Sequence, residues 1–139
     1  MKINFMKTHP DAVIPSRGSA GAAGFDLVAV SLKRAADLYI YDIGIAMEIP
    51  AGYFAAIFPR SSIFFTGLEL TNCVGVIDSD YRGEILVGLQ NSGDADYVIQ
   101  PADRIAQLMV VPVVQAQVKM VDQLDETQRG AGGFFSTGK

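Results

Sequence analysis

Residues 72–85 read NCVGVIDSDYRGEI: an apolar run enters an acidic turn that contains glycine and then resumes as a second apolar run. This pattern predicts two β-strands, and the simplest interpretation is a hairpin with an acidic turn. The alternative is a catalytic site. If the turn is extended, Asp78 and Asp80 lie on one face about 6.6 Å apart. One carboxylate could then deprotonate a water molecule while the other orients the site or a hydrated cation.

The sequence on both sides of this stretch is also typical of β-strands. Residues 42–49 alternate apolar and polar side chains, and residues 53–58 are rich in β-branched and aromatic residues. Residues 105–120 predict a long strand in which Pro112 lies at an edge or a bulge, because proline donates no ladder hydrogen bond. Many short strands separated by turn signals predict an all-β sandwich or barrel.

Residues 84–90 repeat the alternation. Ile85, Val87 and Leu89 are expected to point toward the core from one face of this strand. Leu86 lies on the opposite face, which indicates a strand that is covered on both sides.

Helical signals are few. Residues 31–37 (SLKRAAD) predict two helical turns, and residues 61–66, ended by Gly67, predict one. Residues 1–122 are expected to form a single domain. Residues 123–139 are polar and then glycine-rich, with too few apolar side chains to pack alone, so we expect a mobile C-terminal arm.

Composition limits the classes of function. The 139 residues are 50% hydrophobic and 19% charged with a net charge of -4, which excludes a disordered chain and argues against a basic nucleic-acid-binding face. No segment approaches the roughly 20 apolar residues of a membrane span, and no secretory signal is visible. With one cysteine, Cys73, and one histidine, His9, the sequence argues against disulfides, zinc and triad chemistry. We expect a cytoplasmic protein that contacts neither membrane nor nucleic acid.

The run Pro59-Arg60-Ser61-Ser62 follows a predicted strand and could bind phosphate. Arginine offers a planar fork of donors, serine offers a hydroxyl, and the first free amides of a helical turn point at an anion. The alternative is that Ser61 only caps a short helix and Arg60 is solvated.

Two polar side chains lie inside apolar runs. Asp26, in AGFDL at 23–27, needs hydrogen bonds or a cation if it is buried. Gln107, in DRIAQL at 103–108, needs a partner, which is either a ligand or the backbone.

The C-terminal residues 132–139, GGFFSTGK, formally contain the spacing G-x-x-x-x-G-K. A Walker A loop also needs a preceding strand, a following Ser or Thr and a helix, so we reject that interpretation. The remaining alternatives are a disordered tail and a glycine-rich arm that folds over a polyphosphate.

Five motifs follow one another along the chain: AGFDLVA at 23–29, PRSS at 59–62, NCVGVIDSDYRGEI at 72–85, DRIAQLM at 103–109 and RGAGGFFSTG at 129–138. Together they closely resemble the five ordered motifs of the trimeric deoxyuridine triphosphatases (dUTPases). The resemblance implies a distorted β jelly-roll, or β-clip barrel, and a homotrimer whose active sites each use all three chains. It also implies Mg²⁺-dependent hydrolysis of dUTP to dUMP and pyrophosphate by attack of water on the α-phosphorus.

The resemblance further implies roles for single residues. Asp78 resembles the general base, and Tyr81 resembles the ring under the deoxyribose that excludes a 2'-hydroxyl. Asp26 is similar to a carboxylate that holds Mg²⁺ through water. In the arm, Arg129 resembles a γ-phosphate ligand and Phe134 the lid over uracil. The other implied substrate-binding residues are Asn72, Gly75, Val76 and Ile77 around uracil, Arg60, Ser61, Ser62 and Gln107 at the phosphates, and Gly133, Phe135, Ser136 and Thr137 in the arm.

Four positions depart from the family pattern. Phe25 replaces a tyrosine, and Ser62 and Ala102 each replace a glycine. Phe135 replaces a glycine of the arm, and at positive φ this would cost roughly 1–2 kcal/mol. Phe135 could therefore be the lid in place of Phe134.

Two other functions remain open. The replacement at Phe135 suggests a regulatory module that keeps the fold and the nucleotide pocket but signals through its arm. The dCTP deaminases share the architecture, although the third motif with Tyr81 favours a dUTPase. As a dUTPase, the protein would keep uracil out of DNA and supply dUMP for dTTP synthesis.

Overall fold

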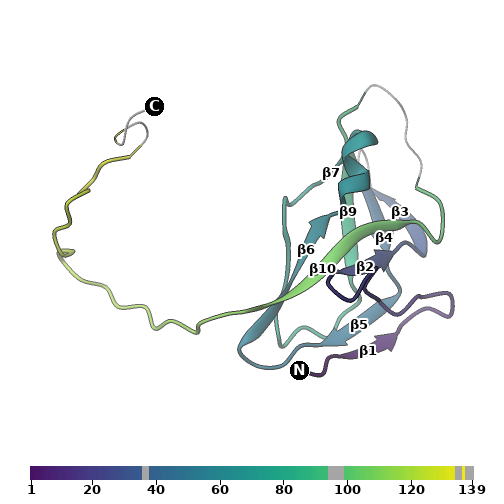
Figure 1. The fold of residues 1–139 in the computed structure, drawn as a ribbon, viewed down its shortest axis with the longest axis horizontal. Coiled ribbons are helices and arrows are strands. Elements are labelled where there is room, and N and C mark those ends of the chain that lie inside the picture. Colours follow the sequence, from purple (N-terminus) through teal and green to yellow (C-terminus); the bar gives the residue numbers. More distant parts are fainter. Residues whose placement is uncertain (36–37, 94–98, 134–135, 137–139) are drawn as a thin grey trace.

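The computed structural model describes residues 1–35, 38–93, 99–133 and 136. These residues form an all-β body, as the sequence predicts (Figure 1). The strands are β1 (Asn4–Lys7), β2 (Phe25–Val28), β3 (Ser31–Ala35), β4 (Leu38–Asp42), β5 (Ile45–Glu48), β6 (Tyr53–Pro59), β7 (Leu68–Leu70), β8 (Gly75–Ile77), β9 (Leu86–Asn91) and β10 (Arg104–Pro112). A 3-10 helix, η1 (Ser61–Phe65), confirms the short helical turn expected there.

The strands pair antiparallel in three sheets. One has the order β2-β10-β6-β8, the second has the order β3-β4-β9-β7, and β1 pairs with β5. Strand β10 runs along β6 from Ala106, opposite Pro59, to Pro112, opposite Tyr53. Most neighbours within a sheet are distant in sequence, so the fold depends on long-range pairing.

Residues 72–85 do not form the expected hairpin. Strand β8 pairs with β6, whereas β9 pairs with β4 and β7 in the other sheet. The acidic turn therefore carries the chain from one sheet to the other. Local sequence predicts that a turn occurs there but not which strands pair on either side of it.

Apolar side chains of the two four-stranded sheets pack into one core. The alternation in β9 is confirmed on its inner face, because Ile85, Val87 and Leu89 are all buried. Leu86, expected to be covered as well, is 48% exposed in this chain. The expectation of a strand covered on both sides is therefore wrong for the single chain.

The predicted continuous strand 42–49 is broken at Gly44. Gly44 has φ +67, and its carbonyl accepts hydrogen bonds from the amides of Thr8 (2.8 Å) and His9 (3.3 Å). A Cβ at Gly44 would lie 2.9 Å from the Cβ atoms of both Ala12 and His9. The bend thus needs glycine for its conformation and for its close packing.

The helix predicted over residues 31–37 is wrong, because residues 31–35 form β3 (36–37 lie outside the described residues). Ser31 and Lys33 lie on one face of the strand, and both donate to Asp42, at 2.7 and 2.8 Å. Burial disfavours the charged carboxylate, but these hydrogen bonds outweigh it and hold the pKa of Asp42 below its ordinary value. This pairing across β3 and β4 overrides the weak helical signal.

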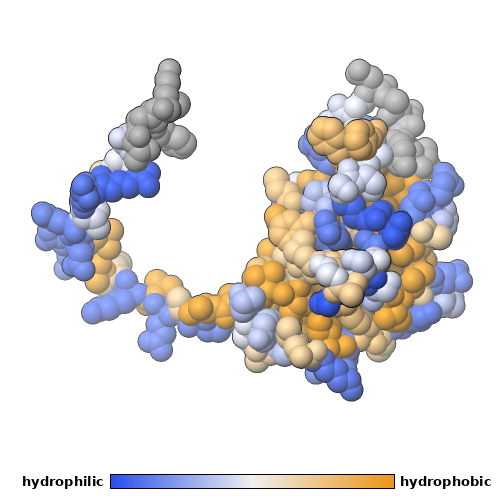
Figure 2. Space-filling view, viewed as in Figure 1, coloured by the Kyte–Doolittle hydropathy of each residue, from blue (hydrophilic) through white to orange (hydrophobic). Residues whose placement is uncertain are grey.

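Strand β10 ends at Pro112, so the predicted strand 105–120 is too long. Val113 still donates a backbone hydrogen bond to Gly52, at 2.9 Å, but the chain beyond it leaves the sheets (Figure 1). Figure 2 shows hydrophobic side chains along this extended segment. Val114, Val118 and Met120 are 88%, 99% and 92% exposed.

The bend at Gly44 predicts a difference between two glycine substitutions. Gly52 also has positive φ, +82, but a Cβ there would meet nothing within 4 Å. We expect Gly52→Ala to cost about 1–2 kcal/mol of unfolding free energy from backbone strain alone. Gly44→Ala should cost more, because strain and overlap with Ala12 and His9 add. Urea denaturation of both variants measures the difference, and equal losses would contradict this account.

Candidate functional site

A hollow of about 230 Å³ lies where β8 meets the acidic turn. Its wall contains all six of the residues predicted in this stretch to hold the nucleoside and the attacking water: Asn72, Gly75, Val76, Ile77, Asp78 and Tyr81. Leu86 lines the same hollow, so its exposed face belongs to this pocket. We call this hollow the turn pocket.

The turn itself is tightly folded. The Tyr81 amide donates to the carbonyl of Asp78 at 3.2 Å, and Arg82 Nη1 donates to the carbonyl of Ser79 at 2.8 Å. The extended conformation that would place Asp78 and Asp80 on one face is therefore wrong. Asp78 lines the turn pocket, whereas Asp80 lines a separate hollow.

The Tyr81 side chain is fixed at two points. Its hydroxyl donates to the backbone carbonyl of Glu84 at 3.0 Å. A Cβ on Gly83 would lie 2.5 Å from the Tyr81 Cζ atom, so only glycine lets the ring lie over that residue. The ring remains 46% exposed and can meet a ligand in the turn pocket.

A second group of predicted residues gathers around Asp26 on β2. Asp26 Oδ1 lies 2.9 Å from Arg60 Nε, and Oδ2 lies 3.1 Å from Arg104 Nη1. Arg60 Nη1 also donates to the carbonyl of Arg104 at 3.2 Å. Two guanidinium groups share one carboxylate, so the cluster keeps a net positive charge that can attract an anion. We call it the arginine cluster.

This geometry decides the alternatives left open for two motifs. Arg60 is only 23% exposed at its side chain and is paired, so its interpretation as a solvated residue before a capping serine is wrong. The cap of η1 is Arg60 itself, without a side-chain capping hydrogen bond. Asp26 is satisfied by arginines. Ser62 stays beside the cluster, since Arg60 Nη1 lies 3.4 Å from its Oγ.

The side-chain amide of Gln107 lies beside the arginine cluster. It lies opposite Asp26 on β2 and opposite Phe58 on β6, and its Nε2 donates to the carbonyl of Pro59 at 2.9 Å. The partner of this amide nitrogen is therefore backbone.

Arg104 is the residue of this cluster that sequence reasoning missed. The positive charge of Arg104 at the start of an apolar strand could have indicated a role in binding an anion. What could not be read from the sequence is the register that places β10 beside Asp26.

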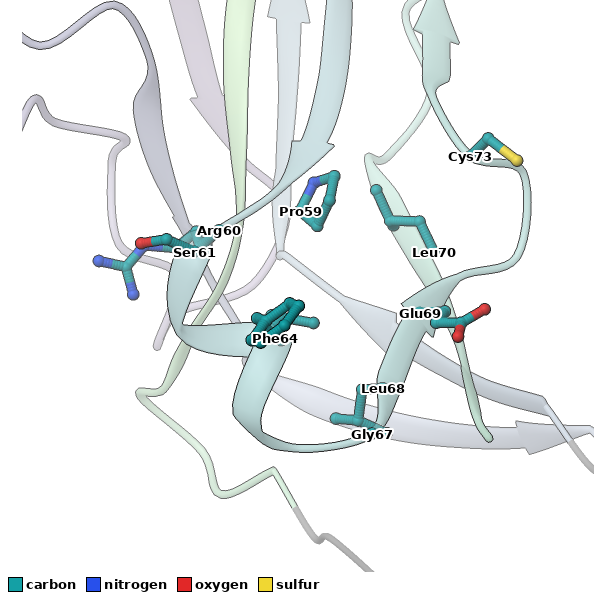
Figure 3. A pocket seen from close by; sticks show the side chains of 10 residues that line it. Pro59, Arg60, Ser61, Phe64, Gly67, Leu68, Glu69, Leu70 and Cys73 are labelled. Carbon is teal, nitrogen blue, oxygen red and sulfur yellow. The ribbon is translucent and has the colours of Figure 1, made fainter. Parts of the chain in front are cut away.

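A larger groove of about 610 Å³ begins beside the arginine cluster. Figure 3 shows Arg60 and Ser61 on one side of it, with Glu69 and Cys73 on the other side. Pro59, Phe64 and Leu70 make its walls largely apolar. Ser61 therefore lies at the end of the groove nearest the cluster.

The turn pocket and the arginine cluster lie apart within one chain. Ile77 pairs with Ala55 of β6, which places Asp78 near Phe54, whereas Asp26 shares a row with Phe58. Four residues along β6 correspond to about 13 Å, and three strand spacings from β2 to β8 to about 14 Å. The backbones of Asp26 and Asp78 are thus roughly 20 Å apart.

The predicted arm residues lie in the segment beyond β10. Arg129 Nε donates to the carbonyl of Gly132 at 2.9 Å, and the Ser136 amide donates to the carbonyl of Gly133 at 3.1 Å. In Figure 1 this segment stands away from the sheets. Phe134, Phe135 and Thr137 lie outside the described residues.

The part of the chain that the structure describes contains no group of three His, Cys, Asp or Glu side chains that could hold a metal ion. A metal at this site would need most of its ligands from substrate and water. No helix among the described residues has the length and apolar content to cross a bilayer.

Comparison with known proteins decides the family. Residues 10–138 match the dUTPase protein-family model. The chain belongs to the dUTPase family. This confirms the resemblance carried by the five motifs, and the alternative of a dCTP deaminase is not supported.

Relatives and solved structures agree with this assignment. The deoxyuridine 5'-triphosphate nucleotidohydrolase of Wolinella succinogenes is 48% identical over all of this chain and 95% of its own length. That of Nautilia profundicola is 43% identical over the full length of both. These relatives confirm the expected enzyme class, a dUTP diphosphatase.

Solved structures confirm the jelly-roll fold. A mutant dUTPase of Staphylococcus bacteriophage 80alpha with dUpNHpp superposes with a TM-score of 0.86 at 21% identity, covering 99% of both chains. A mutant dUTPase of phage phi11 of S. aureus, described with a structural Mg(II) ion, has a TM-score of 0.78 at 20% identity over 91% of this chain and all of its own.

The loop that leads into Arg104 holds a strained residue at one of the positions that depart from the family pattern. Ala102, where the family usually has glycine, has φ +76. We expect Ala102→Gly to raise the unfolding free energy by about 0.5–1 kcal/mol, because relief of left-handed strain outweighs the greater entropy of unfolded glycine. Thermal or urea unfolding measures the gain. A loss of stability would show that the strain is small.

Proposed function

We propose that this dUTPase hydrolyses dUTP to dUMP and pyrophosphate by attack of water on the α-phosphorus, with Asp78 as the general base. The observation that carries the proposal is the position of Asp78, exposed in the turn pocket beside Tyr81 and Asn72. A carboxylate in contact with solvent can take a proton from water as it attacks. The phage 80alpha dUTPase is similar in fold and was solved with dUpNHpp.

Recognition of the nucleoside follows from the same pocket. The Tyr81 ring, held by its hydrogen bond to Glu84, would pack under the deoxyribose and leave no room for a 2'-hydroxyl. Asn72 and the backbone of Gly75, Val76 and Ile77 would read the uracil edge, since strand amides and carbonyls offer fixed donors and acceptors.

The arginine cluster would bind the phosphates. Arg60 and Arg104 supply positive charge already oriented by Asp26, while Ser61, Ser62 and Gln107 supply hydroxyls and an amide. Phosphoryl transfer needs mainly such positioning and charge neutralisation. Arg129, Ser136 and Thr137 of the arm would add contacts when it closes, with Phe134 or Phe135 over the base.

A magnesium ion would fit this site with the substrate's phosphates and water as its ligands. Both oxygens of Asp26 already accept from arginines, which argues against direct ligation. Mg²⁺ commonly keeps several waters and binds phosphates with one or two carboxylates, so Asp26 would hold it through water. When bound, the ion neutralises charge on the triphosphate.

The roughly 20 Å between Asp26 and Asp78 supports a site shared between chains. One chain would supply the turn pocket and another the arginine cluster, as in the homotrimer that the family resemblance implies. The exposed apolar side chains of the segment after β10 support the same assembly, because contact with other chains would cover them. We further propose a cytoplasmic role in keeping uracil out of DNA and supplying dUMP for dTTP synthesis.

Selective turnover tests the reaction. We expect Mg²⁺-dependent release of pyrophosphate from dUTP, with little from dCTP, dTTP or UTP. Asp78→Asn should lower kcat by about 10²–10⁴, the usual contribution of a general base. Asp80→Asn is the matched control, because Asp80 lies outside the turn pocket and should leave kcat nearly unchanged. Equal losses in both variants would contradict the assignment of the base.

Mixed oligomers test whether sites are shared. Asp78→Asn and Arg60→Gln chains, each nearly inactive alone, would be co-expressed with different tags and the mixed species purified. In a ring of three chains, every purified mixed trimer has one of its three shared sites with both residues intact, so activity should return to about a third of the parent value. If each chain carries a complete site, mixing restores nothing. Size-exclusion chromatography checks that each variant assembles.

A further inference from the structure

We propose that Glu84 is a positioning residue that holds the Tyr81 ring and thereby sets the preference for deoxyribose over ribose. This inference rests on the proposed function and deepens it. Glu84 lines the turn pocket, but its Oε1 accepts from the Gly44 amide, so the role assigned to it is indirect. It acts by tying the backbone that carries the Tyr81 acceptor to the bend at Gly44.

The first step is the contact between Tyr81 and Glu84. The Tyr81 hydroxyl donates to the Glu84 backbone carbonyl at 3.0 Å, and Gly83 leaves the ring room to lie there. The orientation of the ring is therefore set by the position of one carbonyl group. Any movement of the Glu84 backbone moves the far end of the ring.

The second step is the anchor of Glu84 itself. Its Oε1 accepts a hydrogen bond from the Gly44 amide at 3.1 Å, and the residue is partly buried. Gly44 is held in turn, because its carbonyl accepts from Thr8 and His9, and the space beside it is closed: an added Cβ would lie 2.9 Å from the Ala12 Cβ. The anchor is thus a rigid part of the body.

Backbone hydrogen bonds also hold the chain on the C-terminal side of Glu84, and we call them the clamp. The Ile85 amide donates to Ile45 at 2.9 Å, and the Ile43 amide donates to Ile85 at 3.2 Å. Strand pairing in β9 begins at Leu86. The Glu84 carbonyl shares one planar peptide group with the Ile85 amide, so the clamp's bond to Ile45 holds this group on its C-terminal side. The Glu84 carboxylate, bound to the Gly44 amide, holds the Cα on the other side, toward the acidic turn.

Loss of the Glu84 anchor is expected to change sugar selectivity more than it changes the position of Asp78, the proposed general base. Asp78 is held at the other end of the turn by the Tyr81 amide, at 3.2 Å, and this bond does not pass through the Glu84 side chain. Loss of the anchor should let the Tyr81 ring tilt and admit a 2'-hydroxyl. A general loss of structure would instead lower turnover of both sugars alike.

The test compares kcat/KM for dUTP and UTP in four variants. Glu84→Ala removes the acceptor, whereas Glu84→Gln keeps an oxygen for the Gly44 amide. Tyr81→Phe removes the hydroxyl at the other end of the contact. Glu69→Ala is the matched control: the Glu69 carboxylate also accepts a hydrogen bond, from Ser92 Oγ at 2.7 Å, but Glu69 lies on β7, outside the turn pocket.

We expect Glu84→Ala and Tyr81→Phe each to lower the ratio of kcat/KM for dUTP to that for UTP by about tenfold. This corresponds to the loss of one orienting contact of about 1.4 kcal/mol. Glu84→Gln and Glu69→Ala should keep the parent ratio. The double variant Tyr81→Phe with Glu84→Ala should be no less selective than either single variant, because both act on one contact.

An unchanged dUTP/UTP ratio of kcat/KM in Glu84→Ala would overturn the proposal. An equal loss of this ratio in Glu84→Gln would also overturn it, because the effect would then come from the charge and not from the hydrogen bond. Dissociation constants of dUMP and UMP, measured by calorimetry, give the same ratio without turnover. They test Glu84 even if the parent enzyme fails to hydrolyse dUTP, which would refute the proposed reaction separately. Thermal unfolding of the Ala and Gln variants identifies a loss of fold.

Discussion

The pairing of β10 between β2 and β6 is the constraint on which the functional geometry depends. Its register places Gln107 between Asp26 and Phe58, and the chain leaves β6 directly into Arg60. A shift of β10 by one residue would turn Gln107 to the other face of the sheet, away from Asp26. The arginine cluster therefore exists because three strands distant in sequence are hydrogen-bonded in this register.

The second consequence of the topology is the crossing of the chain between sheets at residues 78–85. The crossing leaves the turn open on the side of the turn pocket, where Asp78 and Tyr81 meet solvent. It also places Asp78, at the end of β8, far from the arginine cluster. The same packing that forms a rigid body thus places the two parts of the candidate site apart within one chain, and the proposed assembly would bring them together between chains.

Much of the site could be predicted from residue type. Asp78, Tyr81 and Asn72, expected around the nucleoside, gather in one pocket, and Arg60, Gln107 and Asp26, expected at the phosphates and metal, gather in another place. The errors came from local signals that tertiary contacts overrode. Residues 31–37 resembled a helix, but the pairing of Ser31 and Lys33 with Asp42 stabilises a strand. Arg104 was missed because its partner is 78 residues away.

The sequence by itself determined the strand-rich composition and the family, and it supplied the residues that we propose as reacting groups, because alternation and short motifs are local properties of the chain. Only the tertiary structure decided that β8 and β9 separate into different sheets, that Gly44 breaks a strand, and that Arg104 joins Asp26. Each of these depends on which distant strands pair and in which register. Such pairing is selected by the burial of the whole core, which no short stretch of sequence contains.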